Sequence, residues 1–324
     1  MSKIRVGVLR GGTSREYEKS LKSGASVLQN LPEKYIGCDI LITKEGTWHL
    51  GGIPITPEKL FKKVDVIFNA LQGDFLENRH IQHIFESHNI PYTGADSLSS
   101  IVTTNKALVK KVLSLHGIKV PYSIQVKKID HTKEKIREIF RTFPMPAIVK
   151  PLSSTYSLGV SLAKTLKELE EGMERAFAYS STVIIEEYIK GKDAKCLVVE
   201  KFRKKKYYAF LPIELKRPKG AEFLDNTIRI SGVAEKISPG NFTQKEKEGM
   251  EHAAISAHRI VGLRHSSKTD FVVNPRRGVY LLEIDPLQGF DEDSSTSKSL
   301  SAVGAKMSHF VDHMIGLALA DKKR

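Results

Sequence analysis

The sequence predicts an α/β protein that begins with a small parallel sheet, and three observations support this fold class. Apolar strand-like runs alternate with helical segments through residues 1–96, a pattern typical of strands joined by crossover helices. Two later apolar runs, 268–273 and 280–285, flank the turn sequence NPRRG and predict an antiparallel hairpin. The chain has 324 residues, of which 40% are hydrophobic and 27% are charged, which is enough for two or three folded domains.

The elements of the N-terminal region follow from apolar runs and their polar boundaries. A polar-capped helix is expected from about Ser14 and a second helix over 81–87. The expected strands cover 3–9, 38–43, 65–71 and 90–94.

A helix over 105–116 is expected to link this region to the next. Thr103 or Thr104 would cap its N-terminus, and Gly117 would end it. The apolar stripe of this helix would contain Leu108, Val112 and Leu115.

The remaining elements predict two further units. A helix of the central unit opens with the capping box Thr165-x-x-Glu168, and a C-terminal helix opens with Thr243-x-x-Glu246. The other expected elements are strands 123–127, 147–150, 159–163, 183–189, 196–200 and 207–212, a helix over 132–143, a flexible segment 217–240, the hairpin and a last helix. This order predicts three domains, 1–96, 97–182 and 183–324.

Composition limits the class of partner. The formal charge of +14 would permit contact with nucleic acid, and KFRKKK at 201–206 is the densest basic run. That run lies between two strand-like segments, so a solvated hairpin tip is favoured, and no nucleic-acid-binding motif accompanies it. The N-terminus lacks a secretory apolar region, and no apolar run reaches the roughly 18 residues of a membrane span. We therefore expect a cytoplasmic protein without nucleic-acid or membrane partners.

The hairpin carries the strongest chemical signal. Glu283 and Asp285 stand two residues apart and face the same side of a strand. If Asp270 pairs opposite Glu283, the residues on one face are Asp270, Val272, Leu281, Glu283 and Asp285. Three crowded carboxylates repel one another, and Mg²⁺ bridging nucleotide phosphates would turn this repulsion into attraction. A metal site is therefore predicted, and a solvated acidic strand face is the alternative.

Two other strand ends suit a nucleotide. Lys150 closes a strand and precedes the hydroxyl-rich loop 151–159, whose backbone N–H groups could cover phosphates while the lysine neutralises them. In the segment 183–193, Glu186 and Asp193 could accept hydrogen bonds from an adenine amino group and from ribose hydroxyls. An ordinary surface lysine and solvent-facing acids are the alternatives.

These features, in this order, resemble the D-alanine–D-alanine ligase family of the ATP-grasp superfamily, over nearly the whole chain. The motifs that carry the resemblance are GGTSREYEKSLKSG at 11–24, ALQGDFLENRHIQ at 70–82 and YTGADSLSSIVTTNK at 92–106. The resemblance implies an ATP-grasp fold, α/β with an α+β C-terminal part, behind a Rossmann-like N-terminal domain. It also implies a homodimer.

The resemblance further implies roles for particular residues. The implied ATP contacts are Lys106, Lys150, Glu186, Glu187, Ile189, Asp193 and Arg229. The implied ligands of two Mg²⁺ or Mn²⁺ ions are Asp270, Glu283 and Asp285. The implied catalytic residues are Glu16, Tyr156, Ser157, Lys268 and Gly289, and the implied substrate contacts are Glu16, Gln72 and Ser294.

The implied reaction has two steps and serves peptidoglycan synthesis. One D-alanine carboxylate attacks the γ-phosphate of ATP, and the amine of a second D-alanine captures the acylphosphate. The alternatives are a ligase for another amino-acid acceptor, a catalytically weak ATP-binding homologue, and a basic nucleic-acid-binding protein. A nicotinamide dehydrogenase is disfavoured, because Gly11 and Gly12 are not followed by G-x-G-x-x-G.

Several positions depart from the family pattern. The departures are Gln72 for histidine, Tyr156 for serine, Arg229 for lysine, Ile230 for tyrosine, Lys268 for arginine and Asp285 for asparagine. In addition, Asp291, Glu292 and Asp293 lie near the place of the second carboxylate, where added negative charge is unfavourable. The ATP half of the site is therefore better preserved than the acceptor half.

Overall fold

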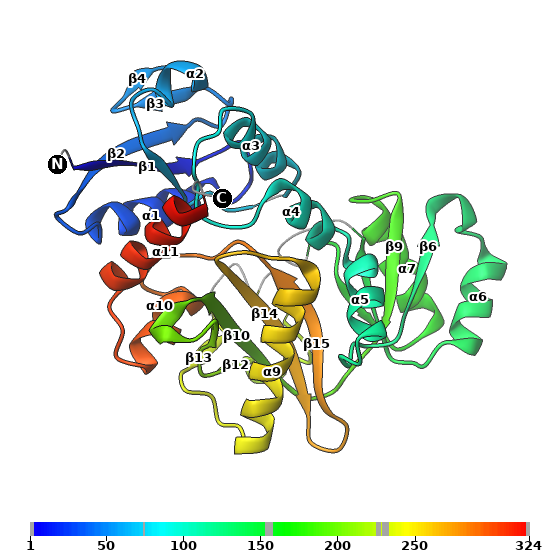
Figure 1. The fold of residues 1–324 in the computed structure, drawn as a ribbon. Coiled ribbons are helices and arrows are strands. Elements are labelled where there is room, and N and C mark those ends of the chain that lie inside the picture. Colours follow the sequence, from blue (N-terminus) through cyan, green and yellow to red (C-terminus); the bar gives the residue numbers. More distant parts are fainter. Residues whose placement is uncertain (1–2, 74, 153–157, 225–227, 229–232, 322–324) are drawn as a thin grey trace.

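The computed structural model describes residues 3–73, 75–152, 158–224, 228 and 233–321. Within this part of the chain the strands form three separate sheets, each packed against helices (Figure 1). None of the described helices has the length and apolar character of a membrane span. The predicted α/β fold class is confirmed.

The N-terminal sheet has the strand order β4-β3-β2-β1-β5. Strand β1 pairs in parallel with β2 and β5, and β3 and β4 extend the sheet antiparallel at one edge. The elements are β1 (Ile4–Gly11), α1 (Tyr17–Gln29), β2 (Tyr35–Ile42), β3 (Trp48–Leu50), β4 (Ile53–Pro54), α2 (Pro57–Leu60), β5 (Val66–Asn69) and α3 (Phe75–Ser87). The strand expected at 90–94 is reduced to an isolated bridge between Ile67 and Tyr92.

The central sheet is antiparallel, with the order β6-β9-β7-β8. Helices α6 and α7 bury their apolar faces on it, and Thr165 and Glu168 form the predicted capping box of α7. The elements are β6 (Ser123–Lys127), η1 (Lys128–Asp130), α6 (Lys133–Thr142), β7 (Ala147–Pro151), β8 (Ser161–Ala163), α7 (Leu166–Phe177) and β9 (Thr182–Glu187).

The C-terminal sheet is also antiparallel, with the order β13-β12-β10-β14-β15 and β11 beside β10. Helix α9 packs on this sheet, and its predicted capping box of Thr243 and Glu246 is confirmed. The elements are β10 (Lys192–Glu200), η2 (Phe202–Lys204), β11 (Tyr207–Ala209), β12 (Ile213–Lys216), β13 (Glu235–Ile237), α9 (Gln244–Val261), β14 (Ser266–Asn274), β15 (Gly278–Asp285), α10 (Ser295–Ala302) and α11 (Met307–Asp321). The basic run 201–206 lies at the turn between β10 and β11, as predicted.

Two short helices, α4 (Ser97–Thr104) and α5 (Lys106–Leu115), connect the N-terminal and central sheets. The side chain of Asn105, rather than Thr103 or Thr104, caps α5 by accepting the Leu108 N–H at 3.0 Å.

The predicted apolar stripe of α5 is also wrong. Leu108 and Leu115 are exposed, and the face of α5 that packs inward carries Val109, Lys110 and Leu113. The reason is that a lysine occupies the buried face, so the apolar pattern alone selects the wrong side.

The N-terminal and C-terminal parts share one hydrophobic core. Val6 and Phe68 of the first sheet pack in the same cluster as Leu197 of β10, and α11 supplies Phe310 and Met314. The last helix of the chain therefore packs against the first sheet, and Figure 1 shows this helix, α11, in red beside α1. Burial of this apolar surface fixes the first sheet against the third.

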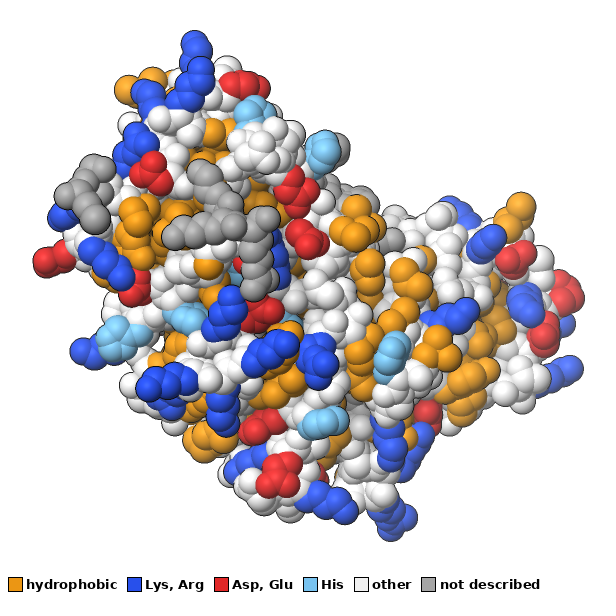
Figure 2. All heavy atoms as spheres, in the orientation of Figure 1, with side chains coloured by type: hydrophobic (Ala, Val, Ile, Leu, Met, Phe, Trp, Pro, Cys, Tyr) orange, Lys and Arg blue, Asp and Glu red, His pale blue; other side chains and the backbone are white. Residues whose placement is uncertain are grey.

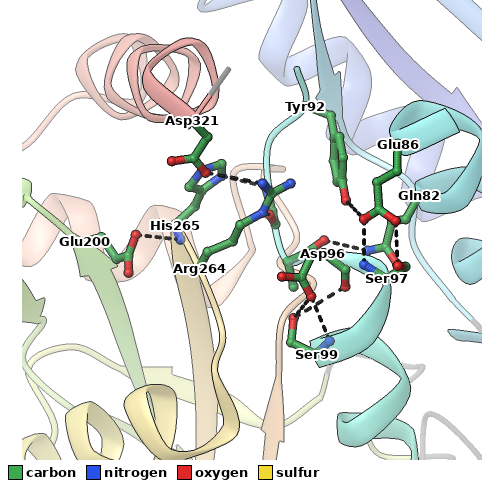
Figure 3. Close-up of polar contacts among 12 residues, drawn as sticks. Gln82, Glu86, Tyr92, Asp96, Ser97, Ser99, Glu200, Arg264, His265 and Asp321 are labelled. Atoms are coloured by element: carbon green, nitrogen blue, oxygen red, sulfur yellow. Dashed lines mark hydrogen bonds and ion pairs between the residues drawn. The ribbon is translucent and has the colours of Figure 1, made fainter. Parts of the chain in front are cut away.

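A polar network reinforces this contact at the start of β14 (Figure 3). The Arg264 guanidinium lies 4.5 Å from the Tyr92 ring centroid, and its Nε donates to the Gly94 carbonyl at 2.8 Å. Its Nη1 donates to Asp321 of α11 at 3.2 Å. Three distant segments of the chain therefore meet at one guanidinium.

His265 is the second member of this network. It is 1% exposed, with Nδ1 3.0 Å from the Gly94 backbone nitrogen and Nε2 2.9 Å from Asp321. Because the Gly94 N–H must donate, Nδ1 is the acceptor and the neutral ring carries its proton on Nε2. Burial is the main cause that lowers the pKa of His265, with the Arg264 charge adding to it.

This lowered pKa predicts a pH dependence of stability. Unfolded His265 binds protons more tightly than folded His265, so its contribution is complete above about pH 6.5 and is lost as the pH falls toward the folded pKa. We expect the difference in unfolding free energy between pH 7.5 and pH 5.5 to be smaller in His265→Asn than in the wild type, as measured by urea denaturation. Equal differences in the two proteins would contradict this role.

Candidate active site

Three neighbouring strands place charged side chains in register. Lys195 of β10 pairs across from Asp270 of β14, and Asp270 pairs across from Glu283 of β15. Two residues earlier on β14, Lys268 pairs across from Asp285. The predicted pairing of Asp270 with Glu283 is confirmed.

The hairpin contains a bulge that changes one predicted position. After the Asp270–Glu283 pair, Phe271 pairs with Leu281, so Leu282 is the extra residue. Leu281 is buried in the core under α9, whereas Leu282 packs with Ile189 and Val272 on the site face. The expectation that Leu281 shares the carboxylate face is therefore wrong, because a bulge shifts the alternation by one residue.

Each of the three carboxylates contacts a lysine. The Lys195 Nζ lies 2.8 and 2.7 Å from the two oxygens of Asp270, and the Lys268 Nζ lies 3.1 Å from Asp285. Lys106 lies 3.7 Å from Glu283. Among the described residues no three His, Cys, Asp or Glu side chains are grouped so that they could hold a metal ion. The three-carboxylate metal site therefore stays a prediction.

The partly buried Lys268–Asp285 pair perturbs the pKa of both groups. Burial opposes the charge of Lys268, but Asp285 and Asp270 outweigh it and raise the lysine pKa above its ordinary value. Burial also raises the pKa of Asp285, which accepts the Leu287 N–H at 2.8 Å through its other oxygen. The lysine therefore keeps its charge beside this carboxylate.

A pocket lies between the central and C-terminal sheets, above this row of charges. It contains about 760 Å³ of space between atoms, including part that is open to solvent. Asp270 and Glu283 line it. The described residues that were predicted to contact ATP also line it, and they are Lys106, Lys150, Glu186, Glu187, Ile189 and Asp193. The structure thus brings these predicted residues together.

Lysines converge on Glu186 at one end of this pocket. The Lys150 Nζ lies 2.8 Å from Glu186, and Lys110 of α5 contacts the same carboxylate oxygen. Burial and the nearby Lys150 charge lower the pKa of Lys110 well below its ordinary value. The sequence analysis missed Lys110, although its place four residues after Lys106 puts both lysines on one side of a helix.

Arginines form ion pairs with two further acids of the pocket, Asp193 and Glu187. Arg217 forms an ion pair with Asp193 and donates to the Gly191 carbonyl at 3.0 Å, and Arg277 forms an ion pair with Glu187. Arg217 itself lines the pocket. The sequence analysis missed both arginines, because neither lies near its partner in the sequence.

Three of the residues predicted for the amino-acid side, Gln72, Gly289 and Ser294, lie in or against the loop after β15. The Gln72 side chain donates to the Gln288 carbonyl at 2.6 Å, and Glu16 forms an ion pair with Lys19 at 2.9 Å. A Cβ on Gly289 would lie 3.1 Å from Oδ2 of Asp291 and 3.3 Å from Cβ of Ser294, so a side chain here would require these neighbours to shift. The Ser294 hydroxyl caps α10 by accepting the Ser297 N–H at 3.1 Å.

Comparison with known proteins identifies the family. The family model described as D-ala D-ala ligase C-terminus matches residues 112–316. A D-alanine–D-alanine ligase of Clostridium beijerinckii is 31% identical, over 96% of this chain and 97% of that protein. The chain belongs to the D-alanine–D-alanine ligase family. It is an ATP-dependent ligase, as the sequence predicts.

Other relatives in the comparison have different names. The vancomycin/teicoplanin A-type resistance protein VanA of Enterococcus faecium is 28% identical, over 98% of this chain and 99% of that protein. The crystal structure of the VanG D-Ala:D-Ser ligase of Enterococcus faecalis superposes with a TM-score of 0.86 at 25% identity, covering 98% of this chain and all of that chain. The ATP-grasp fold is therefore confirmed, and the name of the VanG enzyme pairs D-alanine with D-serine.

Some predicted site residues lie outside the described residues of this ligase. They are Tyr156, Ser157 and Arg229, and the departure at Ile230 lies there as well. Their roles stay predictions from the family pattern.

The lysine cluster predicts a large effect of one substitution on stability. Glu186→Gln would leave Lys110 and Lys150 buried without their shared carboxylate, and we expect the free energy of unfolding to fall by about 3–5 kcal/mol. Glu187→Gln on the same strand is the matched control, because its partner Arg277 is exposed, and its expected effect is under about 1 kcal/mol. Urea denaturation of both variants tests this. Similar losses in the two would contradict a special role of the buried cluster.

Proposed function

We propose that this ligase joins two D-alanine molecules at the expense of ATP, for peptidoglycan synthesis. The observation that supports this most is that one pocket unites the described predicted ATP contacts with Asp270 and Glu283. Its apolar lining includes Ile189, Val272 and Leu282, which suits the flat face of an adenine. Family membership supplies the reaction class.

In this proposal the lysines stabilise phosphate charge. Lys150 and Lys106 reach the pocket from two different elements, and Glu186 and Glu283 hold their ammonium groups in place. The negative charge of a transferring phosphoryl group is spread over its oxygens, and fixed cations stabilise that charge without reorganising. We propose Arg229 as a further cation and Tyr156 and Ser157 as residues of the covering loop.

The proposed reaction has two chemical steps. A carboxylate oxygen of the first D-alanine forms a bond to the γ-phosphorus, and ADP leaves. The neutral amine of the second D-alanine attacks the acyl carbon, inorganic phosphate leaves, and the amine proton passes to solvent. Lys268 and the Gly289 N–H would stabilise the tetrahedral oxyanion, while Glu16 would hold the first ammonium group, with Gln72 and Ser294 as further substrate contacts.

Mg²⁺ or Mn²⁺ would enter with the nucleotide. Mg²⁺ is commonly held by one or two carboxylates together with substrate phosphates, and it neutralises phosphate charge. Glu283, whose side chain is 39% exposed and lines the pocket, fits one such ion. Asp270 and Asp285 fit a second ion poorly, because both oxygens of each already accept hydrogen bonds.

The acceptor is the open part of the proposal. The loop after β15 carries Asp291, Glu292 and Asp293 close to the predicted substrate residues Gly289 and Ser294. A second acceptor class is therefore kept, namely another amino acid.

Phosphate release from Mg·ATP tests the reaction. We expect release that depends on D-alanine and equals dipeptide formation, measured with the purified protein and a panel of D- and L-amino acids. If another amino acid stimulates phosphate release and D-alanine does not, that amino acid replaces D-alanine as the proposed substrate.

Glu283→Ala should lower turnover by at least about a hundredfold, because the cation that neutralises the phosphate charge would lose a protein ligand. Unchanged turnover in this variant, with unchanged circular dichroism, would contradict the metal assignment.

We also propose a cytoplasmic homodimer, with domains 1–96, 97–182 and 183–324. Exposed apolar side chains follow one side of α4 and α5, where Figure 2 shows orange patches. They are Leu98, Ile101, Leu108 and Leu115, and Leu115 is 77% exposed. An apolar surface of this kind on a folded protein is typical of an interface, which supports this dimer.

The dimer proposal predicts an effect of charge on this surface. Leu98→Lys/Leu115→Lys should shift the protein from dimer to monomer in analytical ultracentrifugation, because two ammonium groups would be desolvated in the interface. Ile129→Lys is the control, since Ile129 is exposed on η1 away from α4 and α5. A monomeric wild type would contradict the dimer, and an unaffected dimer would contradict this surface.

A further inference from the structure

Lys195 is a charged residue of the site that the proposed reaction does not use. It lies inside the C-terminal sheet, between β12 and β14, and its side chain is 14% exposed. Its Nζ lies 2.8 and 2.7 Å from the two oxygens of Asp270, whose side chain is 12% exposed. One buried ammonium therefore engages both oxygens of a predicted metal ligand.

This geometry limits what Asp270 can do for a divalent ion. Two charge-assisted hydrogen bonds from one ammonium largely offset the negative charge of a carboxylate. A divalent cation on the same carboxylate would lie close to the lysine charge at low local dielectric, and the two would repel. Asp270 is therefore a weaker ligand than its position in the hairpin suggests.

In the neighbouring Lys268–Asp285 pair, both carboxylate oxygens are likewise engaged in hydrogen bonds. Asp285 gives one oxygen to Lys268 and the other to the Leu287 N–H. Glu283 is different, because its lysine, Lys106, lies 3.7 Å away at the edge of the pocket, and its side chain is the most exposed of the three. All three carboxylates therefore lie beside lysines, and Glu283 is the one most exposed to the pocket.

We propose that the Lys195 ammonium is a built-in cation that replaces one of two divalent ions, so that the enzyme loads a single divalent ion per nucleotide. Glu283 is the main protein ligand of that ion. Asp270 can contribute only the lone pairs that its hydrogen bonds with Lys195 leave available. Lys195 acts through Asp270 and sets the number of ions. The inference rests on the proposed function, because it needs a bound metal–nucleotide complex.

A purely structural role of Lys195 makes a different prediction. A cross-strand ion pair can simply stabilise the contact between β10 and β14. In that case removal of Lys195 would lower stability and leave the number of bound ions unchanged. The number of ions is therefore the decisive readout.

The experiment counts Mn²⁺ bound to the full-length protein with a non-hydrolysable ATP analogue at saturation. Electron paramagnetic resonance of free Mn²⁺ gives the ions bound per chain for the wild type, Lys195→Gln and Lys195→Arg. We expect one ion for the wild type and for the arginine variant, which keeps the charge. We expect two ions for Lys195→Gln, because the freed Asp270 carboxylate becomes a ligand.

A matched control removes a lysine elsewhere on the same sheet. Lys216 lies on β12, exposed, 3.4 Å from Glu235, and Lys216→Gln should still bind one ion. Two ions on the wild type would overturn the inference, and this arm does not depend on whether a variant folds. One ion on a folded Lys195→Gln would overturn it as well.

Failure of the proposed function gives a separate result. If the wild type does not bind the nucleotide analogue at all, the ATP-dependent function and this inference fall together. If the analogue binds and two ions accompany it, only the inference fails. Turnover of Lys195→Gln then adds a second readout, because its dependence on free Mn²⁺ should change from hyperbolic to sigmoidal.

Discussion

The register of β14 between its two neighbours is the constraint on which the rest of the site depends. This strand pairs with β10 on one side and β15 on the other, so Lys195, Asp270 and Glu283 come to lie in one row. Because side chains alternate along a strand, a slip of β14 by one residue would turn Asp270 toward the core and break this row. Val273 and Phe271 of β14 are buried in the core under α9, and their burial opposes such a slip. Hydrophobic packing on one face of the sheet thus fixes the electrostatics on the other.

Charge balance follows from that register. The acids of the site would repel one another strongly if they stood alone, yet in the structure lysines lie beside Asp270, Asp285 and Glu283, and Arg217 lies beside Asp193. These lysines and Arg217 therefore offset the negative charge of the carboxylates in the site. In the proposed function, an entering nucleotide would exchange some of these partners for its phosphates, so these ion pairs would hold the cations where phosphate charge is to lie.

The parts of this arrangement that sequence predicts are those with local causes. Both capping boxes, the hairpin and the pairing of Asp270 with Glu283 depend on residues a few positions apart or on one turn, and all are confirmed. The failures have non-local causes. The bulge at Leu282 depends on how β15 meets the core, and the inward face of α5 is decided by Glu186, which lies on another strand and draws Lys110 inside. The pairing of Arg217 with Asp193 likewise needs the folded β12.

The network at the start of β14 couples this site to the N-terminal domain. His265 immediately precedes β14, and Lys268 follows three residues later on a strand whose pairing leaves it little freedom. His265 and Arg264 in turn hold Gly94, which lies between the first sheet and α4. The N-terminal domain carries Glu16 and Gln72, and Gln72 also contacts the loop after β15 through Gln288. Two separate polar contacts thus fix the first domain relative to Lys268. A reaction in which a group on one domain must meet an acylphosphate on another needs this kind of rigid placement, since misplacement by about an ångström can cost two orders of magnitude in rate.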